Sequence, residues 1–245
     1  MSPDERQDER LRGRRILVTG ASSGIGAAAA RAIHAAGGRV ALLARRQDRL
    51  EELASELDGV AVPADVVDPD AARQAVDDAA EGLGGLDGVV NAAGVLRPGL
   101  IADTDPADWQ AMFDVNVRGL LHVSQAAIGH LRYAGGGDVI NISSMSGRRL
   151  GSTGMAVYAA SKAAVHMVSE GLRRELAPDR IRVAVLAPGV VATHLFGDDD
   201  TSRRVRARAE EAGLRAADVA AAVVDILAAP PHVVHVEVAV LSIDQ

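Results

Sequence analysis

The chain has 245 residues, of which 48% are hydrophobic and 24% charged, a composition typical of a globular protein. Its formal net charge of −7 argues against nucleic acid as a partner, because such proteins usually present a basic face. The absence of cysteine excludes disulfides, thiolate chemistry and Cys-based metal sites. No run approaches the roughly 18 apolar residues that a membrane-spanning helix needs. We therefore expect a cytoplasmic protein that has no membrane partner.

Strand and helix patterns alternate along the chain, after a charged and flexible N-terminal tail expected over residues 1–13. Apolar runs rich in β-branched residues predict strands at 15–20, 39–44, 59–65, 86–94, 137–144, 181–188 and 232–243. Alanine-rich or amphipathic segments predict helices at 26–37, 47–57, 69–83, 105–132, 156–177 and 216–230. Strict alternation predicts an α/β fold over residues 14–245, a single Rossmann-type domain whose doubly wound parallel sheet has helices on both faces.

Two glycine-rich or polar segments, 147–155 and 193–213, interrupt this alternation. Both follow the carboxyl ends of predicted strands, where open α/β sheets bind their ligands. We therefore expect the segment 193–213 to be a lid over a substrate.

The sequence TGASSGIG (19–26) lies between the first predicted strand and the first predicted helix. Glycines let the backbone approach a pyrophosphate closely, and the helix N-terminus favours its charge. The spacing is G-x-x-x-G-x-G rather than the usual G-x-G-x-x-G, and a tight turn without a ligand would also use glycines. Its place after the first strand favours a dinucleotide site. The expected binding residues are Gly20, Ser22, Ser23, Gly24, Ile25 and Gly26.

The end of the second predicted strand indicates which dinucleotide is bound. An NAD site usually has an acidic residue here to hold the ribose 2′-hydroxyl, whereas this chain has Arg45 and Arg46. A guanidinium can pair with the 2′-phosphate of NADP, which a carboxylate would repel. These arginines could instead begin a solvated helix, but the missing acid favours NADP.

Six motifs follow one another in the order known from one family. They are TGASSGIG, NAAG (91–94), Asn116, ISS (142–144), YAASK (158–162) and PGVVAT (188–193). From about residue 14 to the C-terminus, the chain resembles the single-domain short-chain dehydrogenase/reductase family. The resemblance implies an NADP-dependent oxidoreductase that transfers a hydride between the nicotinamide and a carbonyl or secondary alcohol of a small or medium-sized molecule.

The resemblance also implies roles for Asn116, Ser144, Tyr158 and Lys162. Tyr158 would be the proton donor, Ser144 would orient the carbonyl, and Asn116 would hold a water that connects Lys162 to solvent. Tyrosine titrates near pH ~10, and an ammonium group one helical turn away would lower its pKa. We therefore expect Lys162 to tune Tyr158.

Ser143 and Ser146 are alternatives to Ser144. Adjacent residues of a strand point to opposite faces, so only one of Ser143 and Ser144 can face the substrate. The family motif aligns with Ser144.

Further binding residues follow from the resemblance or from their place beside the expected site. Additional cofactor contacts are expected from Asp65, Val66, Asn91, Ala92, Gly94, Pro188, Gly189, Val191 and Thr193. Ala92 departs from the family's common NNAG motif. The substrate is expected among Ser144, Met145, Leu150, Thr153, Met155, His194, Leu195 and Phe196.

We expect no metal, because the histidines form no H-x-x-x-H pair and the acidic run 198–200 is typical of a solvated loop. The resemblance implies a homotetramer, with a dimer as the alternative. Two rival functions are a catalytically silent dinucleotide-binding regulator and a non-redox epimerase or dehydratase with bound NADP. The intact catalytic set argues against the first, and the lack of room for an extra substrate domain argues against the second.

Overall fold

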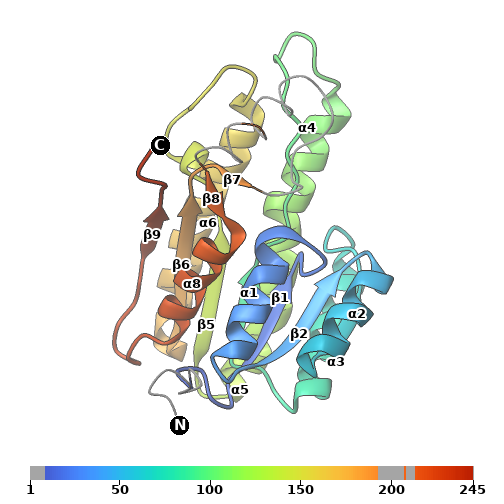
Figure 1. Ribbon diagram of the computed structural model, residues 1–245, viewed down its shortest axis with the longest axis vertical. Helices are drawn as coiled ribbons and strands as arrows, with labels where there is room; N and C mark the ends of the chain where they lie inside the picture. Colours follow the sequence, from blue (N-terminus) through green and yellow to red (C-terminus); the bar gives the residue numbers. More distant parts are fainter. Residues whose placement is uncertain (1–8, 193–206, 208–212, 245) are drawn as a thin grey trace.

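The computed structural model describes residues 9–192, 207 and 213–244. Its centre is a parallel sheet with the strand order β3-β2-β1-β4-β5-β6-β9 (Figure 1). The strands are β1 (Arg15–Thr19), β2 (Arg39–Ala44), β3 (Val60–Pro63), β4 (Gly88–Asn91), β5 (Gly137–Ile142), β6 (Ile181–Pro188) and β9 (Glu237–Val240). The predicted Rossmann-type sheet in a single domain is confirmed.

Helices cover both faces of the sheet. One layer consists of α1 (Gly24–Ala35), α2 (Gln47–Leu57) and α8 (Ala216–Leu227), and the other of α3 (Pro69–Leu83), α5 (Leu120–Tyr133) and α6 (Ala156–Leu176). In Figure 1, α1 and α8 lie in front of the sheet and α6 lies behind it. Successive residues of β1 point to opposite layers: Ile16 and Val18 pack toward α1, and Leu17 packs toward α3. This explains why the three central residues of β1 are all apolar rather than alternating with polar ones.

Local sequence sets the ends of these helices, as α3 illustrates. Asp68 caps its N-terminus, with the carboxylate accepting hydrogen bonds from the backbone N–H groups of Asp70 and Ala71, both at 3.0 Å. Pro69 occupies the first helical turn, where a missing N–H costs nothing. The helix ends at Gly84, which adopts the left-handed conformation with φ 75°.

The long helix predicted over 105–132 is divided in the structure. It consists of α4 (Pro106–Phe113), a π-helical segment η1 (Asp114–Gly119) and α5. Short 3-10 segments, η2 (Met145–Gly147) and η3 (Ala177–Asp179), precede and follow α6. A two-stranded parallel pair, β7 (Val191–Ala192) and β8 (Leu214–Arg215), was not predicted.

Two predicted boundaries were wrong. The strand predicted over 232–243 is only the four residues of β9, because its pairing with β6 begins at Glu237 and ends at Val240. The flexible tail predicted over 1–13 does not hold for its described part. Within the described residues 9–13, Leu11 is fully buried against the core and its N–H donates to the carbonyl of Ala36 at 2.8 Å.

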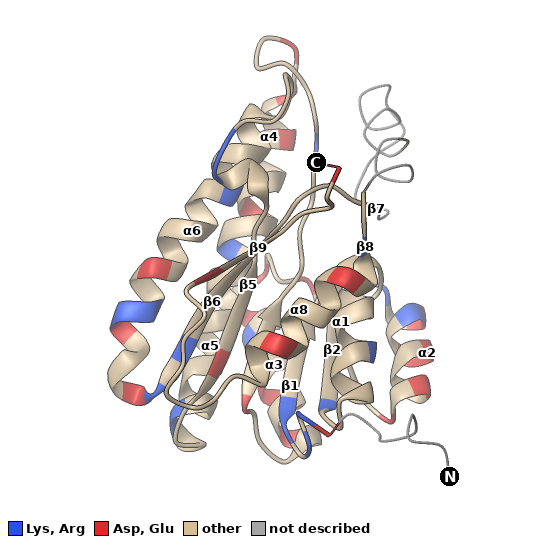
Figure 2. Cartoon of the chain, turned by 60° about the vertical axis from the view of Figure 1, so that its left-hand side comes forward, with Lys and Arg blue, Asp and Glu red and all other residues tan. Residues whose placement is uncertain are grey.

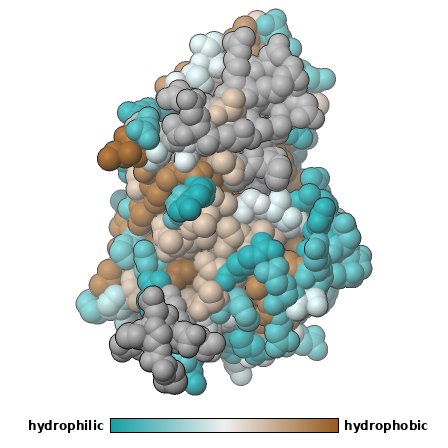
Figure 3. Space-filling view, in the orientation of Figure 1, coloured by the Kyte–Doolittle hydropathy of each residue, from teal (hydrophilic) through white to brown (hydrophobic). Residues whose placement is uncertain are grey.

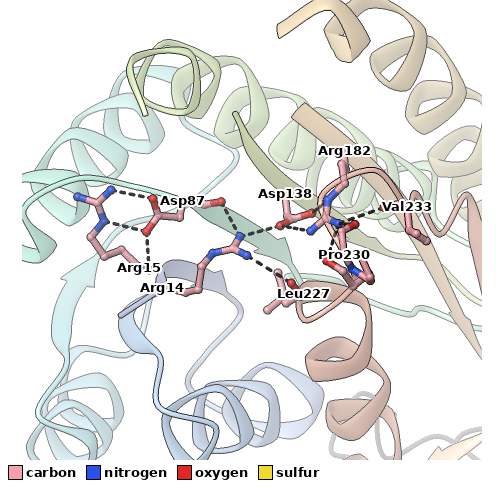
Figure 4. Close-up of polar contacts among 9 residues, drawn as sticks. Arg14, Arg15, Asp87, Asp138, Arg182, Leu227, Pro230 and Val233 are labelled. Carbon is pink, nitrogen blue, oxygen red and sulfur yellow. Dashed lines mark hydrogen bonds and ion pairs between the residues drawn. The ribbon is translucent and has the colours of Figure 1, made fainter. Parts of the chain in front are cut away.

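Charged residues occur along the helices, for example in α2, and near the amino ends of the strands (Figure 2). At that edge, Asp138 of β5 is buried and accepts two hydrogen bonds from Arg182, at 2.7 and 2.9 Å, and one from Arg14, at 2.6 Å (Figure 4). Beside them, Arg15 forms a bidentate pair with Asp87. These ion pairs join the strands at the edge opposite the ends at which the motifs lie.

Candidate functional site

The glycine-rich turn after β1 is held tightly against the turn after β4. The hydroxyl oxygen of Thr19 accepts hydrogen bonds from the N–H groups of Ala92 and Ala93, both at 3.0 Å. Gly20 has φ 66°, and a Cβ there would lie 2.9 Å from the carbonyl oxygen of Ala92. A Cβ on Gly26 would overlap the backbone of Gly20. Glycine is therefore required at both positions by the space as well as by the turn.

This turn leads into α1, whose N-cap residue Ser23 makes no side-chain capping hydrogen bond. The N–H groups of the first helical turn are thus available to an anion in front of them. A cavity of about 470 Å³ extends from here along the carboxyl ends of the strands. Its lining includes the predicted cofactor residues Gly20, Ser22, Ser23, Gly24, Ile25, Gly26, Arg45, Arg46, Asp65, Val66, Ala92, Gly94, Tyr158 and Lys162.

Four predicted cofactor residues do not line this cavity: Asn91, Pro188, Gly189 and Val191. The side chain of Asn91 is buried and turns into the core, where its Nδ2 donates to Ser124 at 3.0 Å and to Asn141 at 2.9 Å. Thr193, the remaining predicted contact, lies outside the described residues, as do His194, Leu195, Phe196 and the acidic run 198–200.

Arg45 and Arg46 lie at the adjoining end of β2. Arg46 donates to the carbonyl oxygen of Ser22 at 3.1 Å and to its hydroxyl at 3.0 Å, so this guanidinium reaches the glycine-rich turn. Arg45 is exposed, and its Nη1 lies 3.8 Å from the carboxylate of Asp65. The end of the cavity near β2 therefore carries two guanidinium groups and one carboxylate.

Tyr158 and Lys162 lie one turn apart on α6, at the opposite part of the cavity, and both are buried. The Lys162 ammonium donates to the carbonyl oxygen of Ile142, at the end of β5, at 2.9 Å. It lies 6.0 Å from the centre of the Tyr158 ring. The spacing along the helix thus brings both side chains to the end of β5.

Burial controls the protonation of both groups. It raises the pKa of Tyr158 to about 12, against the effect of a hydrogen bond with Ser144, which lowers it. Burial also lowers the pKa of Lys162 to about 8. Lys162 is not among the causes that shift the pKa of Tyr158 in this structure, of which desolvation of the phenol is the largest. The expected tuning of Tyr158 by Lys162 stays a prediction.

The three serines after β5 have different surroundings. The Ser143 hydroxyl donates to the carbonyl oxygen of Lys162 at 3.0 Å, so it is committed to α6. The Ser144 hydroxyl accepts a hydrogen bond from the N–H of Ser146 at 3.1 Å and also bonds Tyr158. Of the three, Ser144 is the one whose hydroxyl reaches the phenol.

Asn116 lies in the π-helical segment and is 1% exposed. Its Oδ1 accepts from the N–H of Val95 at 2.8 Å, while its Nδ2 donates to the Val95 carbonyl and the Ser161 hydroxyl, both at 3.0 Å. Asn116 thereby joins the segment after β4 to α6. A Cβ on Gly94 would lie 3.2 Å from Asn116 Oδ1 and 3.6 Å from Lys162 Nζ, so glycine keeps this space open.

The cavity lining also includes residues that were not predicted as cofactor contacts. One of them, Ala93, lies within NAAG, and two others, Val95 and Arg97, follow it. A fourth, Val115, precedes Asn116. Their positions beside two motifs were a usable signal. Arg97 Nε lies 3.7 Å from the carboxylate of Asp108.

None of the described residues predicted to contact substrate lines the cavity; Ser144 is among those outside it, whereas its alternative Ser143 is part of the lining. Met155 is buried in a small apolar cluster with Tyr158, Leu96 and Met112, and Leu150 is 59% exposed. Met145 and Thr153 do not line the cavity either.

Within residues 9–192, 207 and 213–244, no group of three or more His, Cys, Asp or Glu side chains could hold a metal ion. Over the same residues, no helix is both long and apolar enough to cross a membrane.

Comparison with known proteins gives consistent matches. A family model described as short chain dehydrogenase matches residues 14–204. An uncharacterized oxidoreductase of Staphylococcus aureus strain N315 is 37% identical over 220 residues, covering 89% of this chain and 92% of the relative.

Solved structures match over nearly the whole chain. A short chain dehydrogenase of Burkholderia cenocepacia J2315, in complex with NADP, is 37% identical with a TM-score of 0.84, covering 94% of this chain and 97% of that one. An alcohol dehydrogenase of the archaeon Thermococcus sibiricus, complexed with 5-hydroxy-NADP, is 28% identical with a TM-score of 0.84, covering 95% of this chain and 97% of the other.

Proposed function

Because the chain belongs to the short chain dehydrogenase family, we propose that it is an NADP-dependent oxidoreductase acting on a carbonyl or secondary alcohol of a small or medium-sized metabolite. One observation carries this proposal. Ser144, Tyr158 and Lys162 meet at the end of β5, beside a cavity that continues to the glycine-rich turn and the arginines of β2.

The residues present fit a dinucleotide. Gly20 and Gly26 keep side chains out of the turn, and the first N–H groups of α1 face the cavity. Gly94 leaves space beside Lys162, where a side chain would intrude. In this proposal, Ser22, Ser23 and Ile25 hold the pyrophosphate and Asp65 and Val66 lie beside the adenine. A bound NADPH supplies the hydride.

The choice of NADP over NAD rests on Arg45 and Arg46. Both line the cavity where the ribose 2′-substituent would lie, and β2 has no acidic residue at its end. The relatives from Burkholderia cenocepacia and Thermococcus sibiricus, solved with NADP and 5-hydroxy-NADP, support the same choice.

In the direction of reduction, the hydroxyls of Ser144 and Tyr158 both donate hydrogen bonds to the substrate carbonyl oxygen. As the carbonyl carbon gains the hydride, the O–H bond of Tyr158 breaks and a new O–H bond forms on the substrate oxygen. The alcohol leaves and Tyr158 is left as phenolate. With a pKa of about 8, Lys162 is mostly protonated at pH 7, and its ammonium group is the nearest buried cation to this phenolate.

The test is a panel of aldehydes and ketones with NADPH, followed by loss of its absorbance. Turnover of at least one carbonyl, with a higher kcat/KM for NADPH than for NADH, is the expected result. Tight NADPH binding without turnover of any substrate would instead favour a dinucleotide-binding regulator. Product formation without net NADPH consumption would favour an epimerase or dehydratase.

We further propose that the enzyme works in the cytoplasm as a homotetramer. Apolar side chains are exposed on α4, α5 and α6, namely Phe113, Leu121 and Met167. The other edge of β9 is unpaired in the described part of the chain, and Val234, Val236, Leu241 and Ile243 around it are exposed. Brown surface lies on the side of Figure 3 where Figure 1 shows β9. Light scattering after gel filtration would measure the assembly directly.

A further inference from the structure

Near the turn that begins at Ser144 lies a group of charged and titratable side chains that the proposed reaction does not use. Arg148 follows η2, His166 lies one turn beyond Lys162 on α6, and Glu237 begins β9, which lies beside β6 (Figure 1). Arg148 and Glu237 form an ion pair. The Nδ1 of His166 lies 3.7 Å from the Glu237 carboxylate. Segments far apart in the chain thus meet at one carboxylate.

Arg148 is connected to Ser144 through a short and well-bonded turn. Ser144 caps η2, accepting from the N–H of Ser146 at 3.1 Å with its hydroxyl and from the N–H of Gly147 at 2.9 Å with its carbonyl. The N–H of Arg148 donates to the carbonyl of Met145 at 3.0 Å. Because these bonds join residues two and three positions apart within the turn, we expect a displacement of Arg148 to displace the turn as a whole.

One side of this turn rests on α6. A Cβ on Gly147 would lie only 2.8 Å from the carbonyl group of Lys162, so the turn and the helix are in direct backbone contact. The other side of the turn is held by the ion pair between Arg148 and Glu237. Together they hold the turn from two sides, on α6 and on β9.

Burying the Glu237 carboxylate costs free energy, because one of its oxygens has no hydrogen-bond partner among the described residues. This cost indicates a role beyond that of a surface ion pair. The side chain of Glu237 is 20% exposed, and its Oε1 is buried without a hydrogen-bond partner in the described part of the chain. His166 is 17% exposed and its Nε2 is likewise unsatisfied there.

Burial lowers the pKa of His166, although Glu237 and the backbone of Ser144 act in the opposite direction. At neutral pH the imidazole is therefore uncharged, and Arg148 is the cation that balances Glu237.

We infer that Glu237 is a positioning residue for the proposed reaction. Through Arg148, and with His166 packed beside it, Glu237 holds the turn that begins at Ser144, so that the Ser144 hydroxyl stays beside Tyr158. The inference rests on the proposed function, because Ser144 has a task only if a carbonyl oxygen is bound there. It gives the last strand of the sheet a part in catalysis.

The first test uses Glu237→Gln and Arg148→Met, with kinetics, NADPH affinity and thermal unfolding measured on each. We expect kcat to fall by about 10- to 100-fold in both, since small displacements of a catalytic group have effects of this size. The Kd for NADPH should stay within about twofold, because neither residue lines the cavity. The double variant should be no slower than the worse single variant, as both remove one contact. Arg148→Lys should restore part of kcat.

Arg149→Met is the matched control. Arg149 is exposed beside Arg148, and its side chain forms no ion pair with the described residues. Its kcat should equal that of the wild type. An unchanged kcat in Glu237→Gln and Arg148→Met, whatever their thermal stability, would overturn the inference.

A second measurement does not depend on any substrate. Hydrogen exchange of the peptide containing Ser144 to Arg148 should be faster in Glu237→Gln than in the wild type and unchanged in Arg149→Met. If the wild type turns over no carbonyl, the proposed function fails, and the exchange rates still decide whether Glu237 holds the turn. Exchange equal to that of the wild type would overturn the inference by itself.

Discussion

At the scale of single residues, the proposed catalytic pair is notable for its burial. Tyr158 and Lys162 are 7% and 5% exposed. Burial raises the pKa of Tyr158 and lowers that of Lys162, so it favours the neutral form of each. A protonated Lys162 at pH 7 therefore costs stability, while a neutral Tyr158 costs none below about pH 10. The protein keeps an unfavourable charge at the site, which is expected of a functional group rather than of a structural one.

The first prediction concerns Lys162→Met, which should abolish turnover but stabilise the fold. The folded pKa of about 8 lies below the usual 10.5, so the cost is fully present below pH 8 and disappears as pH rises through 10.5. It amounts to about 3 kcal/mol, offset by about 1 kcal/mol for the lost hydrogen bond to Ile142. Urea unfolding at pH 7 should show a more stable variant, and by pH 10 its advantage should be gone. A variant less stable than the wild type at pH 7 would contradict the pKa of Lys162.

The second prediction concerns Arg45 and Arg46. Replacing either with Ala should raise the Kd for NADPH by about 10- to 100-fold, the loss expected for a charge-assisted hydrogen bond to a phosphate. The Kd for NADH should stay nearly constant, since NADH lacks the 2′-phosphate. Arg49→Ala is the control, because Arg49 lies on α2, directly after these arginines, pairs with Glu52 and does not line the cavity. Equal losses for both cofactors would argue against NADP selection by these arginines.

At the scale of elements, the site depends on how turns and helix ends meet. The end of β1 and the end of β4 are tied through Thr19, and the π-helical segment places Asn116 between Val95 and Ser161. A π-turn inside a helix commonly marks a functional site, because it redirects a side chain that a regular helix would point elsewhere.

The third prediction concerns Gly26→Ala, whose methyl group would overlap the backbone of Gly20. Because backbone cannot move aside as a side chain can, the turn must open, and NADPH affinity should fall by at least about tenfold. Gly129→Ala on α5 is the control, with nothing within 4 Å of the new methyl. It should stabilise the helix by about 0.5–1 kcal/mol and leave NADPH affinity unchanged. Titration calorimetry and thermal unfolding measure both effects.

Elements whose ends are set by neighbouring residues could be predicted from the sequence. Elements that depend on contacts between residues far apart in the sequence could not. Asp68, Pro69 and Gly84 set the ends of α3 through nearby atoms, and the helix was expected with the same bounds. The π-turn, in contrast, contains an asparagine that bonds Val95, which is 21 residues away in sequence. Periodicity carries no information about such a contact.

At the scale of the whole molecule, the two edges of the sheet have different tasks. The carboxyl edge gathers the glycine-rich turn, the arginines and the proposed catalytic residues. The amino edge is joined by Asp138 with Arg14 and Arg182. Strand–helix alternation predicted this sheet and the edge that carries the site. The burial that sets the pKa values of Tyr158 and Lys162 could not be predicted, because it arises from packing among several elements.

The fourth prediction concerns Arg182→Met, which leaves Asp138 buried with one of its cationic partners gone. Removing one member of a buried ion pair typically costs about 3–5 kcal/mol, and the Asp138 side chain is only 4% exposed. Arg31→Met is the control, because it breaks an exposed pair with Glu56 and should cost less than about 1 kcal/mol. Kinetic constants of both variants, measured where they are folded, should match the wild type. An equal loss of stability in the two variants would contradict this role of the amino edge.

The central claim is that Tyr158 donates the proton in an NADPH-dependent carbonyl reduction. Tyr158→Phe removes one oxygen and leaves the ring in its apolar cluster with Leu96 and Met112. The measurement is kcat for a reduced carbonyl together with the Kd for NADPH in the wild type and this variant. We expect kcat to fall by about 100-fold or more, as for a lost general acid, while NADPH still binds. A kcat close to that of the wild type would contradict the claim.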